Sequence, residues 1–164
     1  MNWQKLLLIV LIFCVAAAAV FYLLPSEEKR IRKQLAILEG LCSKQSDETR
    51  LQAVRKVTKI AALFTDPCLI KVERRNFVGE LNREEFVGRA NMARTGFPQV
   101  DARFYDISVE LLGKLRASVV MTVRLKGRDG EQYWAETHEV GAGLIKTEGD
   151  WLLSEVTLVE VLEK

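Results

Sequence analysis

The chain has 164 residues, a length that fits one domain with a short appendage, and 49% of its residues are hydrophobic and 28% charged, as in ordinary globular proteins. The formal net charge of +2 hides an asymmetry: residues 26–59 carry nine lysines and arginines against five acids, whereas residues 99–164 carry eight against twelve. A basic first half and an acidic second half, without a basic stripe interleaved with aromatic residues, argue against a nucleic-acid-binding protein.

The first feature along the chain is an uncharged apolar run of nineteen residues, Leu6–Leu24. As a helix with a rise of about 1.5 Å per residue it would be roughly 28 Å long, which matches the hydrocarbon core of a bilayer. Trp3 and Tyr22 lie near its two ends, as anchoring aromatic residues do. We therefore expect residues 1–25 to form a transmembrane anchor in a lipid bilayer; a signal peptide cleaved near Ala16–Ala19 is the alternative.

The charges beside this run bear on its orientation. Lys5 precedes the run, and four basic residues follow it: Lys29, Arg30, Arg32 and Lys33. Counted strictly, they favour a cytoplasmic domain. However, a very short lysine-bearing start before an apolar run is typical of an exported protein, and the four basic residues also belong to an amphipathic helix. We expect a single-pass protein of the bacterial inner membrane with an extracytoplasmic domain.

Residues 26–164 are expected to form one α+β domain whose first half is helical. Ser26 caps a helix that carries acidic residues in its first turn and an apolar face that includes Ile31 and Leu35. The next expected elements are a second helix opened by Ser46–Glu48 and ended by Asp66–Pro67, a short strand Cys68–Val72, and a third helix that Asn82 caps and Gly96 stops.

The cysteines and the only histidine limit the chemistry of the chain. Cys14 falls in the apolar run, and Cys42 and Cys68 would lie at opposite ends of a helix, roughly 27 Å apart. A disulfide needs Cα atoms within about 7 Å, so we interpret Cys42 and Cys68 as unpaired, buried, apolar residues. With one histidine and no ligand spacing, neither a metal site nor a cofactor is expected.

The most informative stretch is a hairpin from Arg116 to Val140, RASVVMTVRLKGRDGEQYWAETHEV, in which apolar and polar residues alternate up to a Gly-Arg-Asp-Gly turn. A loop of two or of four residues places odd-numbered residues of the first strand opposite even-numbered residues of the second. Glu136 and His138 then share the apolar face that carries Met121, whereas an odd loop length would turn both to solvent. Because unpaired burial of such groups is costly, they should be paired, hydrated or lining a cavity.

The strands on either side of this hairpin complete an antiparallel meander. A three-residue loop, Leu112–Lys114, would place Tyr105 opposite Met121 and Ile107 opposite Val119. Gly141 and Gly143 are expected bulge points. The last strand, Trp151–Leu162, is apolar on both faces. We expect helices to cover one of these faces and a second copy of the domain to cover the other, which predicts a homodimer.

Two segments connect this order of elements with a known family: FVGELNREEF at residues 77–86, which leads into the third helix, and EGDWLL at residues 148–153, which enters the last strand. Together they resemble the nuclear transport factor 2-like superfamily, which includes SnoaL-like cyclases and has a cystatin-like α+β fold. The resemblance implies a cone of three helices packed on a curved antiparallel sheet and a conical pocket. The residues expected to line that pocket are Tyr105, Met121, Trp134, Glu136 and His138.

The expected function is that of a membrane-anchored, non-catalytic binding or protein-interaction module, because no complete catalytic set is visible and a fold alone assigns no activity. Its partner would be a membrane protein complex or a small apolar ligand. The alternative is a small-molecule isomerase, cyclase or hydrolase. In that case His138 would be the general base, Glu136 would orient it, and Tyr105 would donate a hydrogen bond to a developing oxyanion.

Overall fold

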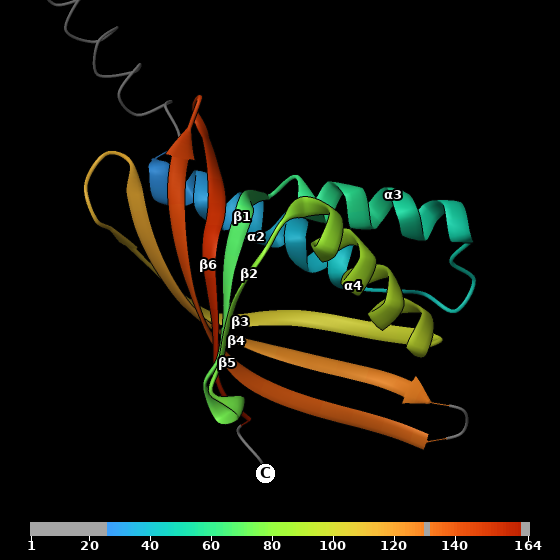
Figure 1. Ribbon diagram of the computed structural model, residues 1–164. Coiled ribbons are helices and arrows are strands. Elements are labelled where there is room, and N and C mark those ends of the chain that lie inside the picture. The colour runs from blue at the N-terminus through green and yellow to red at the C-terminus, as the bar shows by residue number, and fades with distance from the viewer. Residues whose placement is uncertain (1–25, 130–131, 162–164) are drawn as a thin grey trace, which may run out of the picture.

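The structure is a computed structural model that describes residues 26–129 and 132–161 (Figure 1). Its helices are α2 (Glu27–Cys42), α3 (Arg50–Ala61) and α4 (Arg83–Gly96), with one short 3-10 turn, η1 (Glu73–Arg75). Its strands are β1 (Phe64–Val72), β2 (Phe77–Leu81), β3 (Gln99–Leu111), β4 (Arg116–Asp129), β5 (Gln132–Thr147) and β6 (Asp150–Val161). The predicted α+β class is confirmed for these residues.

Each helix starts at a side chain that accepts a backbone hydrogen bond. Ser26 caps α2 by accepting from the N–H of Lys29, as predicted. Asn82 caps α4 in a capping box, also as predicted. The predicted start of α3 at Ser46–Glu48 is wrong, because Thr49 is the cap and forms a capping box with the side chain of Gln52. The side chain of Glu48 is instead used in a buried ion pair, described below.

The strands form one sheet in the order β2-β1-β6-β5-β4-β3. Four neighbouring pairs are antiparallel, but β1 runs parallel to β6, so the prediction of a wholly antiparallel sheet is wrong at this one pair. Residues 77–81 were expected only to lead into a helix, but they form β2, the edge strand beside β1. The last strand, β6, is therefore interior to the sheet.

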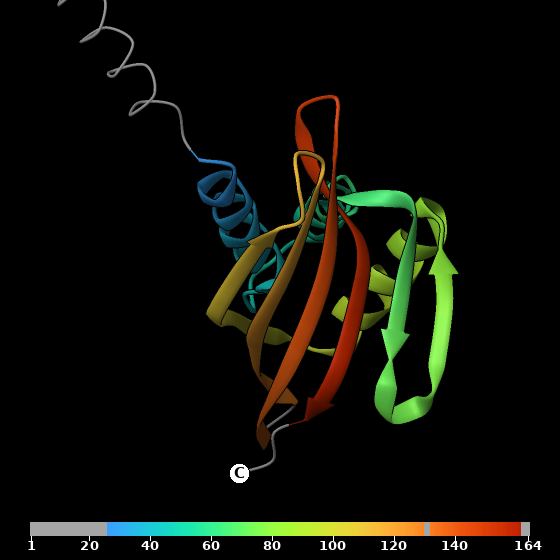
Figure 2. The ribbon, with the colours of Figure 1, turned by 90° about the vertical axis from the view of Figure 1, so that its left-hand side faces the viewer.

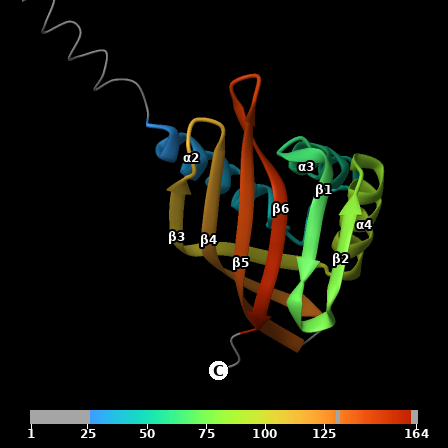
Figure 3. The ribbon, with the colours of Figure 1, turned by 60° about the vertical axis from the view of Figure 1, so that its left-hand side comes forward.

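The three helices cover one face of the curved sheet and leave the other face free of helices (Figure 3). Ile31, Leu35 and Leu38 of α2 are buried against the sheet. The sheet residues of this core are Phe64, Cys68, Ala117, Val119, Met121, Val140, Ala142, Leu144, Trp151 and Leu153. We call the helix-covered side the inner face. The opposite side, which none of these three helices covers, is the outer face. Burial of apolar area on the inner face is the main stabilising contribution to the fold.

The register of the β4–β5 hairpin confirms the face predicted for its second strand. Val123 pairs with His138, Leu125 with Glu136, and Gly127 with Trp134. Directly opposed residues share a face, so Glu136 and His138 lie on the inner face together with Met121. The pairing of Asp129 with Gln132 shifts the register from the one expected, yet it keeps odd residues opposite even ones.

The expected register between β3 and β4 is wrong. Val109, not Ile107, pairs with Val119, and Tyr105 pairs with Thr122. Two departures cause this. Leu111 pairs with Ala117, so the loop is longer than the three residues expected, and this places Val109 opposite Val119. A bulge between Tyr105 and Ser108, where Asp106 adopts a φ of 52°, then shifts the pairing of Tyr105 by one residue. Tyr105 consequently lies on the outer face and is 47% exposed.

Within the part of the chain that the structure describes, no helix combines the length and the apolar character needed to cross a membrane. The predicted span, Leu6–Leu24, lies outside that part.

Candidate functional site

The only histidine is held on the inner face beside a carboxylate. His138 is 8% exposed, and its Nε2 lies 3.0 Å from Oε2 of Glu136, two residues earlier on the same strand. The Glu136 side chain is 55% exposed, so the pair extends from the covered sheet toward solvent. Of the three alternatives expected for these residues, the structure shows pairing, and the pair offers one carboxylate and one imidazole to a bound molecule.

A cavity of about 390 Å³ opens beside this pair at the end of the sheet where η1 lies. It brings together residues from β1, η1, β5 and β6, namely Val72, Arg74, Arg75, Glu136, His138, Leu158 and Val159. We call it the η1 cavity. Three of its residues are valines or leucine, and four are ionisable or polar. This mixture of apolar walls with a few polar groups is typical of small-molecule sites.

The two arginines are the part of this cavity that sequence reasoning missed. Arg74 and Arg75 are exposed, and the side chain of neither forms a hydrogen bond or ion pair with any described residue. They sit on a 3-10 turn that ends at Asn76, which has a left-handed φ of 46°. The sequence Glu-Arg-Arg-Asn between two short strands was the available signal, since a basic pair in a tight turn is held at a defined place.

Two buried nitrogen atoms on the inner face of β5 have no hydrogen-bond partner among the described residues. They are Nδ1 of His138 and Nε1 of Trp134. Their side chains are four residues apart on one face, roughly 13 Å along the strand. Buried polar atoms in native proteins are normally paired, so each of these atoms indicates a place for water or for a ligand atom.

The remaining predicted pocket residues are only partly brought together. Met121 is buried in the core, 4% exposed, and it fills the cone instead of lining the η1 cavity. The indole ring of Trp134 packs 5.1 Å from the ring of Phe97 and lies against Gly127, near the far end of the hairpin. Tyr105 lies on the opposite face, so its expected role as a donor inside the pocket is wrong.

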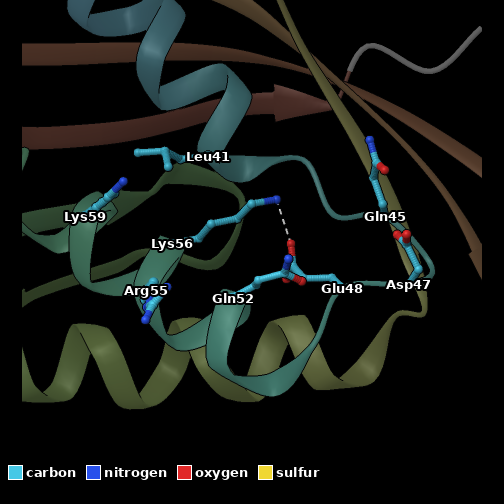
Figure 4. Close-up of a pocket in the computed structure, with 8 residues that line it drawn as sticks. All are labelled: Leu41, Gln45, Asp47, Glu48, Gln52, Arg55, Lys56 and Lys59. Atoms are coloured by element: carbon cyan, nitrogen blue, oxygen red, sulfur yellow. Dashed lines mark hydrogen bonds and ion pairs between the residues drawn. The ribbon is translucent and has the colours of Figure 1, made fainter.

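A second hollow lies between the end of α2 and α3 (Figure 4). Its central group is Glu48, whose side chain is only 3% exposed. The Nζ of Lys56 lies 2.6 Å from Oε2 of Glu48, and the Nη2 of Arg94, from α4, lies 2.8 Å from each carboxylate oxygen. These charges satisfy one another, so this hollow is a structural joint between three helices.

The same joint also closes the end of α2. Arg94 donates hydrogen bonds to the carbonyl oxygens of Leu41, Cys42 and Ser43, which the helix itself leaves unpaired. Burial alone would raise the pKa of Glu48, but the hydrogen bonds from Lys56 and Arg94 outweigh burial and lower the pKa. The carboxylate is therefore held ionised.

No metal centre is indicated by the described residues, because they contain no group of three or more His, Cys, Asp or Glu side chains that could hold an ion. Cys42 and Cys68 are free thiols, as predicted.

Comparison with known proteins gives matches at the level of structure only. No protein-family model matches the sequence, and no curated protein sequence matches it. A nuclear transport factor 2-like protein with a cystatin-like fold from Novosphingobium aromaticivorans superposes with a TM-score of 0.66 at 12% identity, covering 90% of this chain and 88% of that one. A protein from Kribbella flavida superposes with a TM-score of 0.68 at 15% identity, covering 84% and 92%.

A hexachlorocyclohexane dehydrochlorinase is also similar, with a TM-score of 0.67 at 12% identity over 84% of this chain and 86% of that chain. Identities this low show the fold alone. The domain therefore has the nuclear transport factor 2-like, cystatin-like α+β fold that the sequence resemblance predicted.

Proposed function

We propose that this protein is a membrane-anchored, non-catalytic binding module that takes a small, mostly apolar ligand with an acidic group in the η1 cavity. One observation carries the proposal. The cavity combines apolar walls with Arg74 and Arg75, which have no charged partner among the described residues. A guanidinium group binds carboxylates and phosphates through paired hydrogen bonds, so the two arginines would select an anionic group while the walls hold an apolar body.

Binding without catalysis is supported by the state of His138. Its Nε2 is directed to Glu136, so only Nδ1 is without a partner, and the burial of Nδ1 restricts its access to a substrate proton in this arrangement. A general base must come within hydrogen-bond reach of the proton that it removes. Tyr105, the third expected member of a catalytic set, faces the other side of the sheet.

A small-molecule isomerase, cyclase or hydrolase is the second candidate. The 3.0 Å contact between His138 and Glu136 is the kind of contact that orients a histidine for acid–base work, and one structural neighbour is a dehydrochlorinase. His138 would take a proton from the substrate, Glu136 would stabilise the imidazolium, and Arg74 would face the negative charge that develops.

The ligand class is tested with phenylacetate and its neutral analogue phenylacetamide, observed by saturation-transfer NMR on the full chain in lipid nanodiscs. Phenylacetate should bind more tightly than the amide. The double substitution Arg74→Gln/Arg75→Gln should weaken phenylacetate binding about tenfold and leave the amide unchanged, because one charge-assisted contact is worth about 1.4 kcal/mol or more. The control Arg89→Gln/Arg124→Gln removes the same charge elsewhere. Equal losses in both variants would count against the site.

The enzyme alternative is tested by hydrogen exchange. Cyclohexanone in D₂O exchanges its α-protons slowly without a catalyst, and NMR follows the exchange directly. A binding module should leave the rate at the buffer value. Accelerated exchange of the cyclohexanone α-protons that is lost in His138→Ala, in a variant that still binds phenylacetamide, would favour the enzyme.

The anchor and its topology are part of the proposal, and its support is the sequence of Leu6–Leu24. The full chain should float with phospholipid vesicles and resist carbonate extraction, and Leu11→Arg/Val15→Arg should abolish both. In spheroplasts of a bacterium that expresses the chain, added protease should digest the domain. Protection in intact spheroplasts, lost on lysis, would overturn the extracytoplasmic placement.

We propose that the outer face of the sheet pairs with a second copy of the domain. Tyr105 and Val120 are 47% and 46% exposed on it. Val120→Arg should shift a dimer to monomer in sedimentation equilibrium of the detergent-solubilised full chain, whereas a monomeric unsubstituted chain would remove the idea.

A further inference from the structure

Three exposed leucines gather in and beside the loop that joins β3 to β4. Leu111, Leu112 and Leu115 are 46%, 55% and 63% exposed. The loop is closed, because the N–H of Leu112 donates to the carbonyl of Arg116 at 2.9 Å and Gly113 supplies a φ of 104°. Turns are usually made of small and polar residues, so exposed leucines in such a turn mark a surface that another apolar phase covers.

This loop lies at the end of the domain where α2 begins (Figure 2). The backbone N–H of Lys146 donates to the carbonyl of Leu115 at 2.9 Å, and the Nζ of Lys146 lies 2.9 Å from Oε1 of Glu27, in the first turn of α2. Lys146 therefore connects the leucine loop with the first turn of α2. The η1 turn and the end of β6 lie at the opposite end (Figure 3).

The sequence brings an apolar run to the same place. Leu24 precedes the helix cap Ser26 by two residues, which span at most about 7 Å. If Leu6–Leu24 is in a bilayer, the surface of that bilayer must meet this end of the domain. The leucine loop is an exposed apolar feature at this end, so lipid is the apolar phase that would cover it.

Residues of both charges surround the leucine loop. Lys114 lies between the leucines, and Lys29 lies in the first turn of α2; neither forms an ion pair with a described residue. Glu148, in the neighbouring β5–β6 turn, and Asp150, the first residue of β6, carry the opposite charge. The leucines supply apolar area for insertion, and Lys114 can reach anionic headgroups.

We propose that Leu112 and Leu115 insert into the interfacial region of the bilayer and fix the orientation of the domain on it. The proposal rests on the anchoring in the proposed function. It adds a second membrane contact, made by the folded domain, which holds the domain with its β3–β4 end against the lipid and its η1 cavity away from it.

The test places an environment-sensitive nitrobenzoxadiazole label on single cysteines in the full chain, in a Cys14→Ser/Cys42→Ala/Cys68→Ala background. The positions are Leu112→Cys, Leu115→Cys and, as the control, Tyr133→Cys, which is 79% exposed near the other end of β4 and β5. The chain is reconstituted into phosphatidylcholine–phosphatidylglycerol vesicles, and each sample is first checked by flotation. The label at 112 and 115 should show blue-shifted emission and quenching by spin-labelled lipid, and the label at 133 should show neither.

The outcomes separate the two ideas. Vesicles that float the chain while all three labels emit as in water would overturn the inference and leave the anchor intact. A chain that does not float would refute the anchor, and the inference with it. A label at Leu111→Cys should also be quenched, and replacing Leu112 and Leu115 together by Asn should remove that quenching without loss of flotation. Unchanged quenching would also contradict the proposal.

Discussion

The Nη2 of Arg94 lies 2.8 Å from both carboxylate oxygens of Glu48, and this contact joins α4 to the loop between α2 and α3. Glu48→Ala should lower the free energy of unfolding by about 3–5 kcal/mol, because Arg94 and Lys56 would be left near the interior without their counter-charge. Urea denaturation measures the change. The control is Glu28→Ala, which breaks an exposed pair with Arg32 and should cost less than about 1 kcal/mol. Similar losses in both variants would show that the buried ion pairs of Glu48 stabilise the fold no more than an exposed pair does.

The same carboxylate should make stability depend on pH. The pKa of Glu48 is lowered in the folded state, so its contribution is fully present above the ordinary value of 4.5 and is lost as the pH falls through the folded pKa. The difference in unfolding free energy between the wild type and Glu48→Gln should be largest near neutral pH and should shrink in acid. A difference that stays constant down to acid unfolding would contradict the lowered pKa.

Two glycines should respond to alanine in opposite ways. A Cβ at Gly127 would lie 2.3 Å from the indole ring of Trp134, so Gly127→Ala should destabilise the hairpin by about 1–3 kcal/mol and disturb the contact with Phe97. Gly40 lies inside α2 with nothing near its would-be Cβ, so Gly40→Ala should stabilise by about 0.5–1 kcal/mol. Thermal unfolding followed by circular dichroism measures both, and tryptophan fluorescence should change only in Gly127→Ala.

The two described cysteines should be unreactive until the domain unfolds. Burial raises the pKa of the Cys42 thiol to about 11 and that of the Cys68 thiol to about 11, and the thiolate is the reactive form. In a Cys14→Ser background, iodoacetamide at pH 8 should leave both thiols unmodified for hours and should modify both in urea, as mass spectrometry would show. Rapid labelling of Cys68 in the native protein would place it in a more open environment.

The sequence determined the faces of the β4–β5 hairpin because alternation of apolar residues is a local property that strand pairing preserves. Met121, Glu136 and His138 were placed on one face from parity alone, and the register agrees. Tyr105 was misplaced because one bulge, at Asp106, shifts every pairing before it. A non-glycine residue with positive φ leaves no pattern in the apolar residues, so the shift could not be read from them.

The candidate site shows the same division. Glu136 and His138 were found because they interrupt an apolar face, whereas Arg74 and Arg75 were missed because they stand in a turn between two short strands. What brings them to His138 is the parallel pairing of β1 with β6, which places Val72 opposite Leu158. A contact between segments more than sixty residues apart depends on chain topology, and no local periodicity records it.

The length of β5 has a consequence for how a ligand would arrive. Lys146, whose N–H is bonded to the leucine loop, and His138, at the η1 cavity, stand eight residues apart on one strand, roughly 26 Å along it. If the loop binds lipid as proposed, this length of strand separates the opening of the cavity from the lipid headgroups. A lipid tail could not slide in sideways from the bilayer. A ligand would have to enter from the aqueous phase, either by diffusion or from a carrier protein that extends as far as the cavity.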